Sequence, residues 1–313
     1  RLILTVAYYH AVTRDMLYEY EVPVPPFVYN KLLANNGTLS NDGWELGLGA
    51  SLLRTRDWGL DVNANLTVQR SRLRSLGGAC LGMQLTAPRI TPIGGMELGA
   101  GFHGGNNNVL YQIVGQPLGE FYLPKSTGLE LQPDGSRRYE IEDLDHNGRI
   151  NVEDGGDRYV AGQATPKVML GSNIAVRYKN WDLTMQINGA FGHKIFNATA
   201  LAYMNMTSFP DYNVMRGAPQ QNIKDQNVTD YWLEKGDYVN VDYITLGWNV
   251  PLRSRVIRGL RLSCSVNNPW TFTAYSGLTP MINSHVVNAT IGMDDKRSYP
   301  VYRTFSMGVN VQF

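Results

Sequence analysis

Residues 143–154, DLDHNGRINVED, have the residue types and the spacing of a twelve-residue calcium loop. Oxygen-bearing side chains stand at the first, third and fifth positions, a glycine at the sixth and a carboxylate at the last. Ca²⁺ prefers hard oxygen ligands, and loops of this length supply them at these positions while the glycine permits a sharp turn. The predicted ligands are the side chains of Asp143, Asp145, Asn147 and Asp154, the backbone carbonyl of Arg149, and a water held by Asn151.

Two features separate this segment from an EF-hand. Its closing residue is Asp154 where a bidentate glutamate is usual, and no helical pattern flanks it, so it is closer to a dockerin-type loop. We expect a structural Ca²⁺ that orders a long loop, because an unordered loop carries large conformational entropy. The alternative is a solvated turn without metal, since Asp and Asn favour turns on their own.

Aromatic side chains on the connecting segments are candidates for contact with a ligand or with a partner protein. Rings on exposed loops can stack on sugar faces or anchor a protein partner. They can equally pack inside a loop or stand at a membrane interface. The candidates are Tyr122, Phe209, Tyr212, Tyr231 and Trp232.

The sequence gives no reason to expect an enzyme or a nucleic-acid-binding protein. Its five histidines form no metal-ligand spacing, and it contains no GxSxG, HExxH or P-loop motif. The 28 Lys+Arg and 27 Asp+Glu residues nearly cancel, so there is no basic surplus that would attract nucleic acid. These residues therefore make no case for catalysis.

The elements that would position these residues are strands with one apolar and one polar face. The last ten residues, TFSMGVNVQF, alternate strictly, and a tilted strand needs about 9–11 residues to cross a bilayer. This pattern suits a half-buried sheet in a soluble protein, or a barrel with lipid outside and water inside. Eight segments are predicted as strands: 1–12, 43–54, 57–69, 167–178, 181–192, 238–250, 258–269 and 302–313.

The lengths of the connections decide between the two environments. Outer-membrane barrels place short turns on the periplasmic side and long loops outside, whereas a soluble sandwich has no reason to do so. Trp58, Trp181 and Trp248 all fall beside short connections, as an aromatic belt at one membrane interface would. Short connections at 54–57, 179–180 and 251–257 alternate with long ones at 13–42, 70–166, 193–237 and 270–301.

The same alternation limits what the longest connection can contain. Residues 70–166 must hold either no further barrel strand or two, because an odd number would reverse the sides of every later loop. The two candidate segments are GGMELGAGF and NVLYQIVGQP.

Several motifs, in order, resemble the SusC/RagA family of TonB-dependent outer-membrane transporters. Together they cover roughly residues 114–313, and residues 1–70 fit the preceding strands of the family less specifically. The motifs are VGQPLGEFY (114–122), DLDHNGRINVED (143–154), TPKVMLGSNIAVRYKNWDL (165–183), YWLEKGDYVNVDYITLGWNVP (231–251), VNNPWTFTAYSGLTP (266–280) and YPVYRTFSMGVNVQF (299–313).

The resemblance implies an all-β fold, an antiparallel transmembrane β-barrel segment with long extracellular loops and short periplasmic turns. The segment would supply about eight to ten strands of a barrel of about 22. The implied function is nutrient import through the outer membrane of a Gram-negative bacterium, with a glycan, an oligosaccharide or a peptide as cargo and a SusD-like surface lipoprotein as partner.

The family also has parts that this sequence lacks. A plug domain, which contacts TonB, and the N-terminal barrel strands are absent, so we expect residues 1–313 to be the C-terminal part of the barrel wall. Two alternatives stay open. One is a calcium-stabilised surface β-protein that serves adhesion or scaffolding, and the other is a passive porin.

Overall fold

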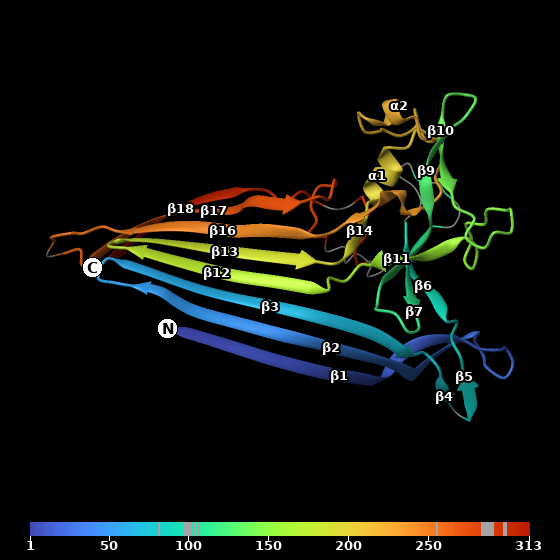
Figure 1. Ribbon diagram of the computed structural model, residues 1–313, viewed down its shortest axis with the longest axis horizontal. Helices are drawn as coiled ribbons and strands as arrows, with labels where there is room; N and C mark the ends of the chain where they lie inside the picture. The colour runs from blue at the N-terminus through green and yellow to red at the C-terminus, as the bar shows by residue number, and fades with distance from the viewer. Residues whose placement is uncertain are drawn as a thin grey trace.

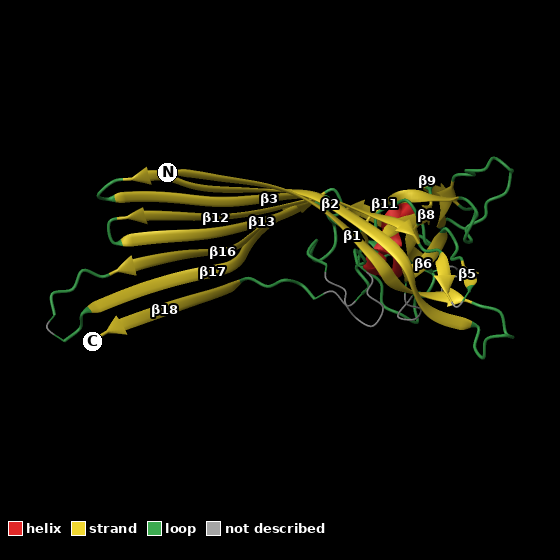
Figure 2. Ribbon diagram, turned by 90° about the horizontal axis from the view of Figure 1, so that it is seen from below, coloured by secondary structure: helices red, strands yellow, loops and turns green. Residues whose placement is uncertain are grey.

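An eight-stranded antiparallel sheet dominates the computed structural model, which describes residues 1–80, 82–96, 102, 104, 107–254, 256–282, 291–296 and 299–313 (Figures 1 and 2). The order of the strands in the sheet follows the chain without a crossover. The expected all-β antiparallel architecture is therefore confirmed. The strands are β1 (Leu2–Glu21), β2 (Lys31–Arg54), β3 (Trp58–Ser75), β12 (Val168–Tyr178), β13 (Trp181–Phe191), β16 (Tyr238–Asn249), β17 (Gly259–Thr273) and β18 (Thr304–Gln312).

All eight predicted strands are present. Three of the four connections predicted to be long are long, at 76–167, 192–237 and 274–303, and the three predicted short ones are short. β2 and β3 are joined through 55–57, β12 and β13 through 179–180, and β16 and β17 through 250–258. These connections lie at the end of the sheet that holds the C-terminus, and the long connections leave from the opposite end (Figures 1 and 2).

The first long connection is shorter than predicted. We expected a loop over 13–42, whereas β1 and β2 stay paired as far as Glu21 and Lys31, which leaves only 22–30 between them. Asp15 has a φ of 58° and lies at a shift in register, as in a β-bulge. A bulge changes which face the following residues take, so the alternation breaks although the pairing continues.

In the described part of 70–166, beyond the end of β3 at Ser75, no further strand joins the eight-stranded sheet. The segment NVLYQIVGQP supplies β7 of a separate sheet, and most of GGMELGAGF lies outside the described residues. That separate sheet has the order β11-β8-β7-β6. Its strands are β6 (Ile90–Gly95), β7 (Asn108–Ile113), β8 (Glu120–Pro124) and β11 (Arg158–Gln163).

One face of the eight-stranded sheet is apolar across its whole width. A single row of paired residues passes through all eight strands, and every member is apolar. Along each strand the next residue points to the other face, where polar side chains predominate. The row is Leu2, Ala50, Val62, Ile174, Met185, Ile244, Val266 and Phe305.

An aromatic belt crosses the same face next to the short turns, as predicted. Trp58, Tyr178, Trp181 and Trp248 are consecutive partners in register. The rings of Trp58 and Tyr178 have centroids 4.3 Å apart, and Trp181 stacks on Trp248 at 5.3 Å. Rings of this kind prefer the level of the lipid headgroups, so the row marks one interface.

A second aromatic contact lies on the same sheet, farther from the short turns. Tyr8 and Trp44 pair across β1 and β2 with ring centroids 4.9 Å apart, and Trp44 pairs in turn with Val68 of β3. Val68 lies ten residues beyond Trp58 on the same strand. At about 3.3 Å per residue and a tilt of about 40°, the two levels are about 25 Å apart, the height of the apolar band of an outer-membrane barrel.

The polar face is joined by hydrogen bonds that cross strands. The Arg261 guanidinium on β17 donates to both carboxylate oxygens of Asp182 on β13, with 2.7 Å between Nη2 and Oδ2. The pair spans the intervening strand β16 above Gly247, where an added Cβ would stand 2.2 Å from Nη2 of Arg261. A side chain at that position would displace the guanidinium.

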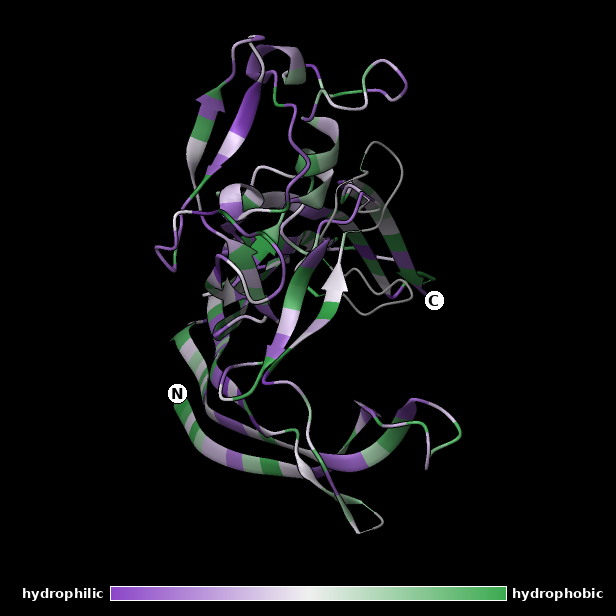
Figure 3. Ribbon diagram, turned by 90° about the vertical axis from the view of Figure 1, so that its right-hand side faces the viewer, coloured by the Kyte–Doolittle hydropathy of each residue, from purple (hydrophilic) through white to green (hydrophobic). Residues whose placement is uncertain are grey.

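At the end with the long connections, the chain builds a packed body with its own hydrophobic core (Figure 1). Seen from this end, the sheet behind it is curved and carries alternating apolar and polar bands along its strands (Figure 3). The most buried side chains of this body come from three connections that are far apart in the sequence, and they include Phe102, Phe121, Leu123, Phe196, Leu201, Ile223 and Met293.

Short elements frame this body. Helices α1 (Ala198–Tyr203) and α2 (Ala218–Gln221) and the 3-10 turn η1 (Asp230–Trp232) lie in the connection between β13 and β16. Three pairs of strands complete it: β4 (Gly78–Cys80) with β5 (Met83–Leu85), β9 (Ser126–Leu131) with β10 (Arg137–Ile141), and β14 (Lys194–Phe196) with β15 (Leu233–Lys235). None of the helices in the described residues is both long enough and apolar enough to span a bilayer.

A charge on the apolar face should cost far more than the same charge on the polar face. Val62→Arg places a guanidinium at mid-height against lipid, and we expect it to lower the free energy of unfolding by about 2–4 kcal/mol. Asn63→Arg, one residue on and facing the other way, is the matched control and should cost much less. Urea unfolding of the full-length protein in phospholipid vesicles measures both, and equal effects would contradict the assignment of the faces.

Candidate functional site

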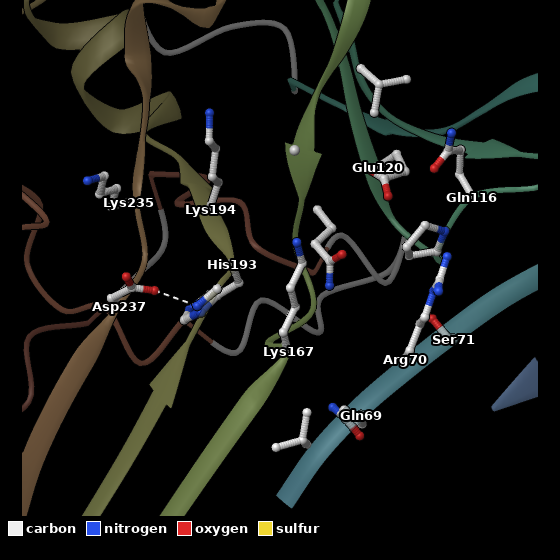
Figure 4. Close-up of a pocket in the computed structure, with 16 residues that line it drawn as sticks. Gln69, Arg70, Ser71, Gln116, Glu120, Lys167, His193, Lys194, Lys235 and Asp237 are labelled. Carbon is white, nitrogen blue, oxygen red and sulfur yellow. Dashed lines mark hydrogen bonds between the residues drawn. The ribbon is translucent and has the colours of Figure 1, made fainter. Parts of the chain in front are cut away.

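A cavity of about 730 Å³ lies where the outer ends of the barrel strands meet the four-stranded sheet (Figure 4). Segments that are distant in the sequence line it: the end of β3, the connection before β8, β11, and the residues that flank β12, β14 and β15. Its polar and charged lining residues include Gln69, Arg70, Ser71, Gln116, Glu120, Lys167, His193, Lys194, Lys235 and Asp237.

Backbone hydrogen bonds hold the two walls of this cavity together. The amide of Leu73 at the end of β3 donates to the carbonyl of Gln116 at 2.9 Å, and the amide of Gly115 donates to the carbonyl of Leu73 at 2.7 Å. The amide of Gln69 donates to the carbonyl of Lys167 at 2.9 Å. The body is therefore fixed to the rim of the sheet, and the cavity has a defined shape.

Four cationic side chains line the cavity: Arg70, Lys167, Lys194 and Lys235. In the described part of the chain, none of them lies within ion-pair distance of a carboxylate, whereas five other Lys and Arg residues do. Three of the four are exposed and Lys194 is half-buried, so water reaches the charges. The cavity is a concentration of positive charge in a chain whose formal net charge is only +1.

The acidic residues of the cavity offset this charge only in part. Asp237 is engaged locally, since its Oδ1 accepts a hydrogen bond of 2.6 Å from the backbone amide of Gly192 (Figure 4). Glu120 is 3% exposed. Burial raises the pKa of the Glu120 carboxyl to about 7, with the nearby Lys167 ammonium acting in the opposite direction. Glu120 therefore carries only a partial negative charge at neutral pH.

His193 is the most buried titratable side chain of the cavity after Glu120. It is 8% exposed, and among the described residues its Nδ1 has no hydrogen-bond partner. Burial lowers the pKa of its imidazole, against an opposing effect of Asp237, so the ring is neutral at physiological pH. A neutral ring with a free nitrogen can still accept or donate one hydrogen bond.

The sequence analysis did not predict the four cationic residues of the cavity as a site, because each of them alone is typical of a solvated loop end. One signal was available. Lys167, Lys194 and Lys235 all stand within a few residues of a predicted strand end on the side of the long connections. In a curved sheet such ends lie close together, but which side chains face one another depends on how the connections fold.

The predicted calcium loop is ordered by its own acidic side chains. Asp143 accepts hydrogen bonds from the backbone amides of Asn147 at 3.2 Å and Gly148 at 2.7 Å. The side-chain amide of Asn147 donates to Asp145 at 2.7 Å, and the backbone amide of Arg149 donates to Asn147 Oδ1 at 2.8 Å. Gly148 has a φ of 78°, which is the left-handed turn that the motif requires of its glycine.

The structure brings a different carboxylate to this loop from the one we predicted. Asp157 joins Asp143 and Asp145, with one oxygen of each within 4.8 Å of the others. Asp154 instead accepts a hydrogen bond from the Tyr111 hydroxyl and lies 3.4 Å from the Arg158 guanidinium. The expected closing position of Asp154 therefore differs from the observed one, because a buried Arg158–Tyr111 pair holds its carboxylate away from the loop.

Asp157 is more deeply buried than Asp154. It is 1% exposed, and its carboxylate accepts backbone amide hydrogen bonds from Leu144 at 2.8 Å and from Asn151 at 2.7 Å. The cluster offers oxygen donors alone, which is the donor set that Ca²⁺ prefers, so the residues present fit this ion. The side chain of Asn147 and the carbonyl of Arg149 stay candidates as ligands.

The five candidate aromatic residues divide into two groups. Tyr122 packs against Tyr111 with centroids 5.3 Å apart, Tyr231 packs against Trp232 at 4.9 Å, and the Trp232 indole donates to the Tyr139 hydroxyl at 2.7 Å. These contacts help to hold the body together, and Tyr231 is still 36% exposed. Phe209 and Tyr212 are 55% and 40% exposed on the connection that follows α1, so they are the better placed for contact with another molecule.

Glu120 should make the stability of the body depend on pH. Its folded pKa of about 7 lies above the ordinary value, so the folded state binds the proton more tightly and loses stability as pH rises from about 4.5 to about 7. Glu120→Gln removes the charge and should stabilise the protein by up to about 3 kcal/mol at about pH 8, with little effect near pH 4.5. Thermal unfolding of the full-length protein at both pH values tests this, and an equal effect at the two would contradict it.

Comparisons with known proteins agree with this architecture. No protein-family model matches the chain. The chain is 28% identical over 337 aligned positions to TonB-dependent receptor P3 of Formosa agariphila, covering 100% of the chain and 32% of that relative. It is 22% identical over 318 positions to TonB-dependent receptor SusC of Bacteroides thetaiotaomicron, covering 97% of the chain and 29% of SusC.

Solved structures show the same fold. The RagAB peptide transporter matches 100% of the chain with a TM-score of 0.70 and 18% identity, and its open-open state matches with a TM-score of 0.73 and 17% identity. The chain spans about a third of the length of the curated relatives and of these structures. This share is consistent with a segment of a larger barrel. The resemblance inferred from the motifs is confirmed: over nearly its whole length the chain is similar to TonB-dependent receptors that include SusC, and it has the fold of the corresponding part of the RagAB structures.

Proposed function

We propose that this chain forms part of the wall and the extracellular mouth of a SusC-like transporter that imports nutrients through the outer membrane of a Gram-negative bacterium. The observation that carries the proposal is the eight-stranded sheet, whose apolar face is bounded by aromatic residues and whose long connections all leave from one end. The match to TonB-dependent receptors over nearly the whole chain supports it. The cargo would be a glycan, an oligosaccharide or a peptide, and no catalytic step is involved.

The two edge strands require further strands as neighbours. Among the residues that the structure describes, β1 pairs only with β2, and β18 pairs only with β17. An unpaired strand edge cannot face lipid, because no water is present there to satisfy its backbone N–H and C=O groups. The remaining barrel strands of the same transporter would cover both edges, together with a plug domain that TonB contacts.

A SusD-like surface lipoprotein is the partner proposed for the outer end. The packed body and the exposed rings of Phe209 and Tyr212 lie at the end of the molecule away from the short turns. Exposed aromatic side chains on a firm scaffold suit a protein contact. The aromatic rings Tyr122, Tyr231 and Trp232 would act indirectly, by keeping that scaffold rigid.

Uptake by cells tests the function. Cells that carry the full-length transporter should take up labelled oligosaccharides or peptides only while TonB is present, and a tag on the transporter should retrieve a surface lipoprotein. Uptake that persists without TonB would indicate a passive porin. Normal uptake after deletion of the transporter gene, with loss of cell adhesion, would indicate a surface scaffold.

We further propose that the acidic loop binds Ca²⁺ as a structural ion. The support is the spacing of its oxygen-bearing residues together with the convergence of Asp143, Asp145 and Asp157. The ion would offset the repulsion among three carboxylates and hold the loop in its turn. The remaining ligands would come from Asn147 and from the carbonyl of Arg149.

Removing the ion should loosen this loop. At about 1 mM Ca²⁺ and a Kd of about 10⁻⁴ M, binding contributes about 1.4 kcal/mol to stability, a factor of about ten in the population of the open loop. Chelation should therefore speed proteolysis within 142–158 about tenfold in the full-length transporter. The double variant Asp143→Asn/Asp145→Asn should show no further response to chelator, and Asp134→Asn, on another loop, serves as control. Identical cleavage rates with and without Ca²⁺ would contradict the proposal.

A further inference from the structure

Lys194 and Lys235 stand directly opposite one another at the rim of the cavity. They are paired in register across β14 and β15, and both line the cavity (Figure 4). Like charges at directly opposed positions of a sheet destabilise it. In the described part of the chain neither lysine has a carboxylate within ion-pair distance to relieve this repulsion. A bound anion would relieve it.

Two further cations complete the positive lining from other segments. Arg70 comes from the end of β3, and Lys167 from the residue before β12. Figure 4 shows them across the same opening from Lys194 and Lys235. The stem of Lys194 passes close over Gly162, where an added Cβ would stand 2.9 Å from its Cδ, so the backbone of β11 leaves a path for this side chain.

The alternative is a set of lysines that simply face water, as exposed lysines usually do. Three observations favour a ligand. The four cations share one hollow, two of them are held opposite one another by strand pairing, and the acids beside them are engaged or buried. Elsewhere Lys31, Lys125 and Lys224 each lie near a carboxylate.

The cavity also offers groups that could orient a ligand without charge. Gln116 is exposed in its lining, and the neutral ring of His193 stands at its inner side. A volume of about 730 Å³ lies within the range of roughly 300–1,000 Å³ that small-molecule sites occupy. One or two units of an oligomeric cargo would fit such a space.

We infer that this cavity is a subsite for an anionic group, a carboxylate or a sulfate, carried on the imported cargo. The inference rests on the proposed transport function and narrows its substrate class. Charge of the opposite sign at the mouth of a conduit both steers a ligand toward it and selects against neutral competitors. The four cations would bind the anionic group while the barrel wall below them carries polar side chains inward.

The test is direct binding to the complete transporter. The cavity variant is Lys167→Gln/Lys194→Gln/Lys235→Gln, and the control with the same loss of charge is Lys125→Gln/Lys179→Gln/Lys224→Gln. Isothermal calorimetry would use three probes: sulfated maltotetraose, a tetra-aspartate peptide and neutral maltotetraose. The first two distinguish a sulfate from a carboxylate as the recognised group.

We expect at least one anionic probe to bind the cavity variant about tenfold or more weakly than the wild type, and to bind the control variant within about twofold of it. The difference in affinity between the wild type and the cavity variant should shrink when the salt concentration rises from about 0.05 M to about 0.5 M, because salt screens the attraction between exposed charges. The affinity for neutral maltotetraose should not change.

The inference is overturned if neither anionic probe shows a difference in affinity between the wild type and the cavity variant. Should the triple variant not reach the outer membrane, the single variants Lys235→Gln and Arg70→Gln, both at exposed positions, give the same comparison. Uptake that still depends on TonB, combined with unchanged anion binding, would leave the transport proposal intact and reject the anionic subsite alone.

Discussion

Complete pairing of the backbone within lipid is the constraint on which the rest of this structure depends. Every strand of the eight-stranded sheet follows its neighbour antiparallel and in register, from β1 to β18. Because hydrocarbon offers no hydrogen bonds, each unpaired group within it costs several kcal/mol. The strands must therefore be long, continuous and joined at their ends. All irregular chain is displaced to the two water-exposed ends.

The displaced chain is unequally divided, and that asymmetry creates the functional end. Three connections are short, while three others are long enough to share a hydrophobic core and to form a body on the outer rim. Backbone hydrogen bonds from β3 to the segment around Gln116 fix the body in place. The charged cavity lies at this junction, where side chains from a strand end and from a loop sheet meet.

Two neighbouring groups of residues in the body, around Arg158 and in the acidic loop, show how buried charges find partners. Arg158 is buried, and its Nη1 donates to the Tyr111 hydroxyl at 2.5 Å and to the Tyr122 carbonyl at 3.1 Å. Asp154 is held at the edge of this group, which leaves Asp157 to close the acidic loop. Burying the Arg158 guanidinium requires these partners, since an unpaired buried charge is very costly. Because Asp154 lies beside the Arg158 guanidinium, Asp157 and not Asp154 is the carboxylate that joins Asp143 and Asp145 in the loop.

The sequence by itself determined the strands, the two faces and the side on which the loops lie. Strict alternation, as in TFSMGVNVQF, is a local property of a strand between lipid and water, and the lengths of the connections set its direction. The full length of β1 and β2 was not predicted, because the bulge at Asp15 interrupts the alternation of apolar and polar residues without interrupting the strand pairing. Three outcomes came from the packing of the folded chain: Lys194 lies opposite Lys235, Arg70 and Lys167 line the same cavity, and Asp157 takes the place predicted for Asp154 beside Asp143 and Asp145. Those outcomes depend on how long connections pack against one another, and no short-range period in the chain records that packing.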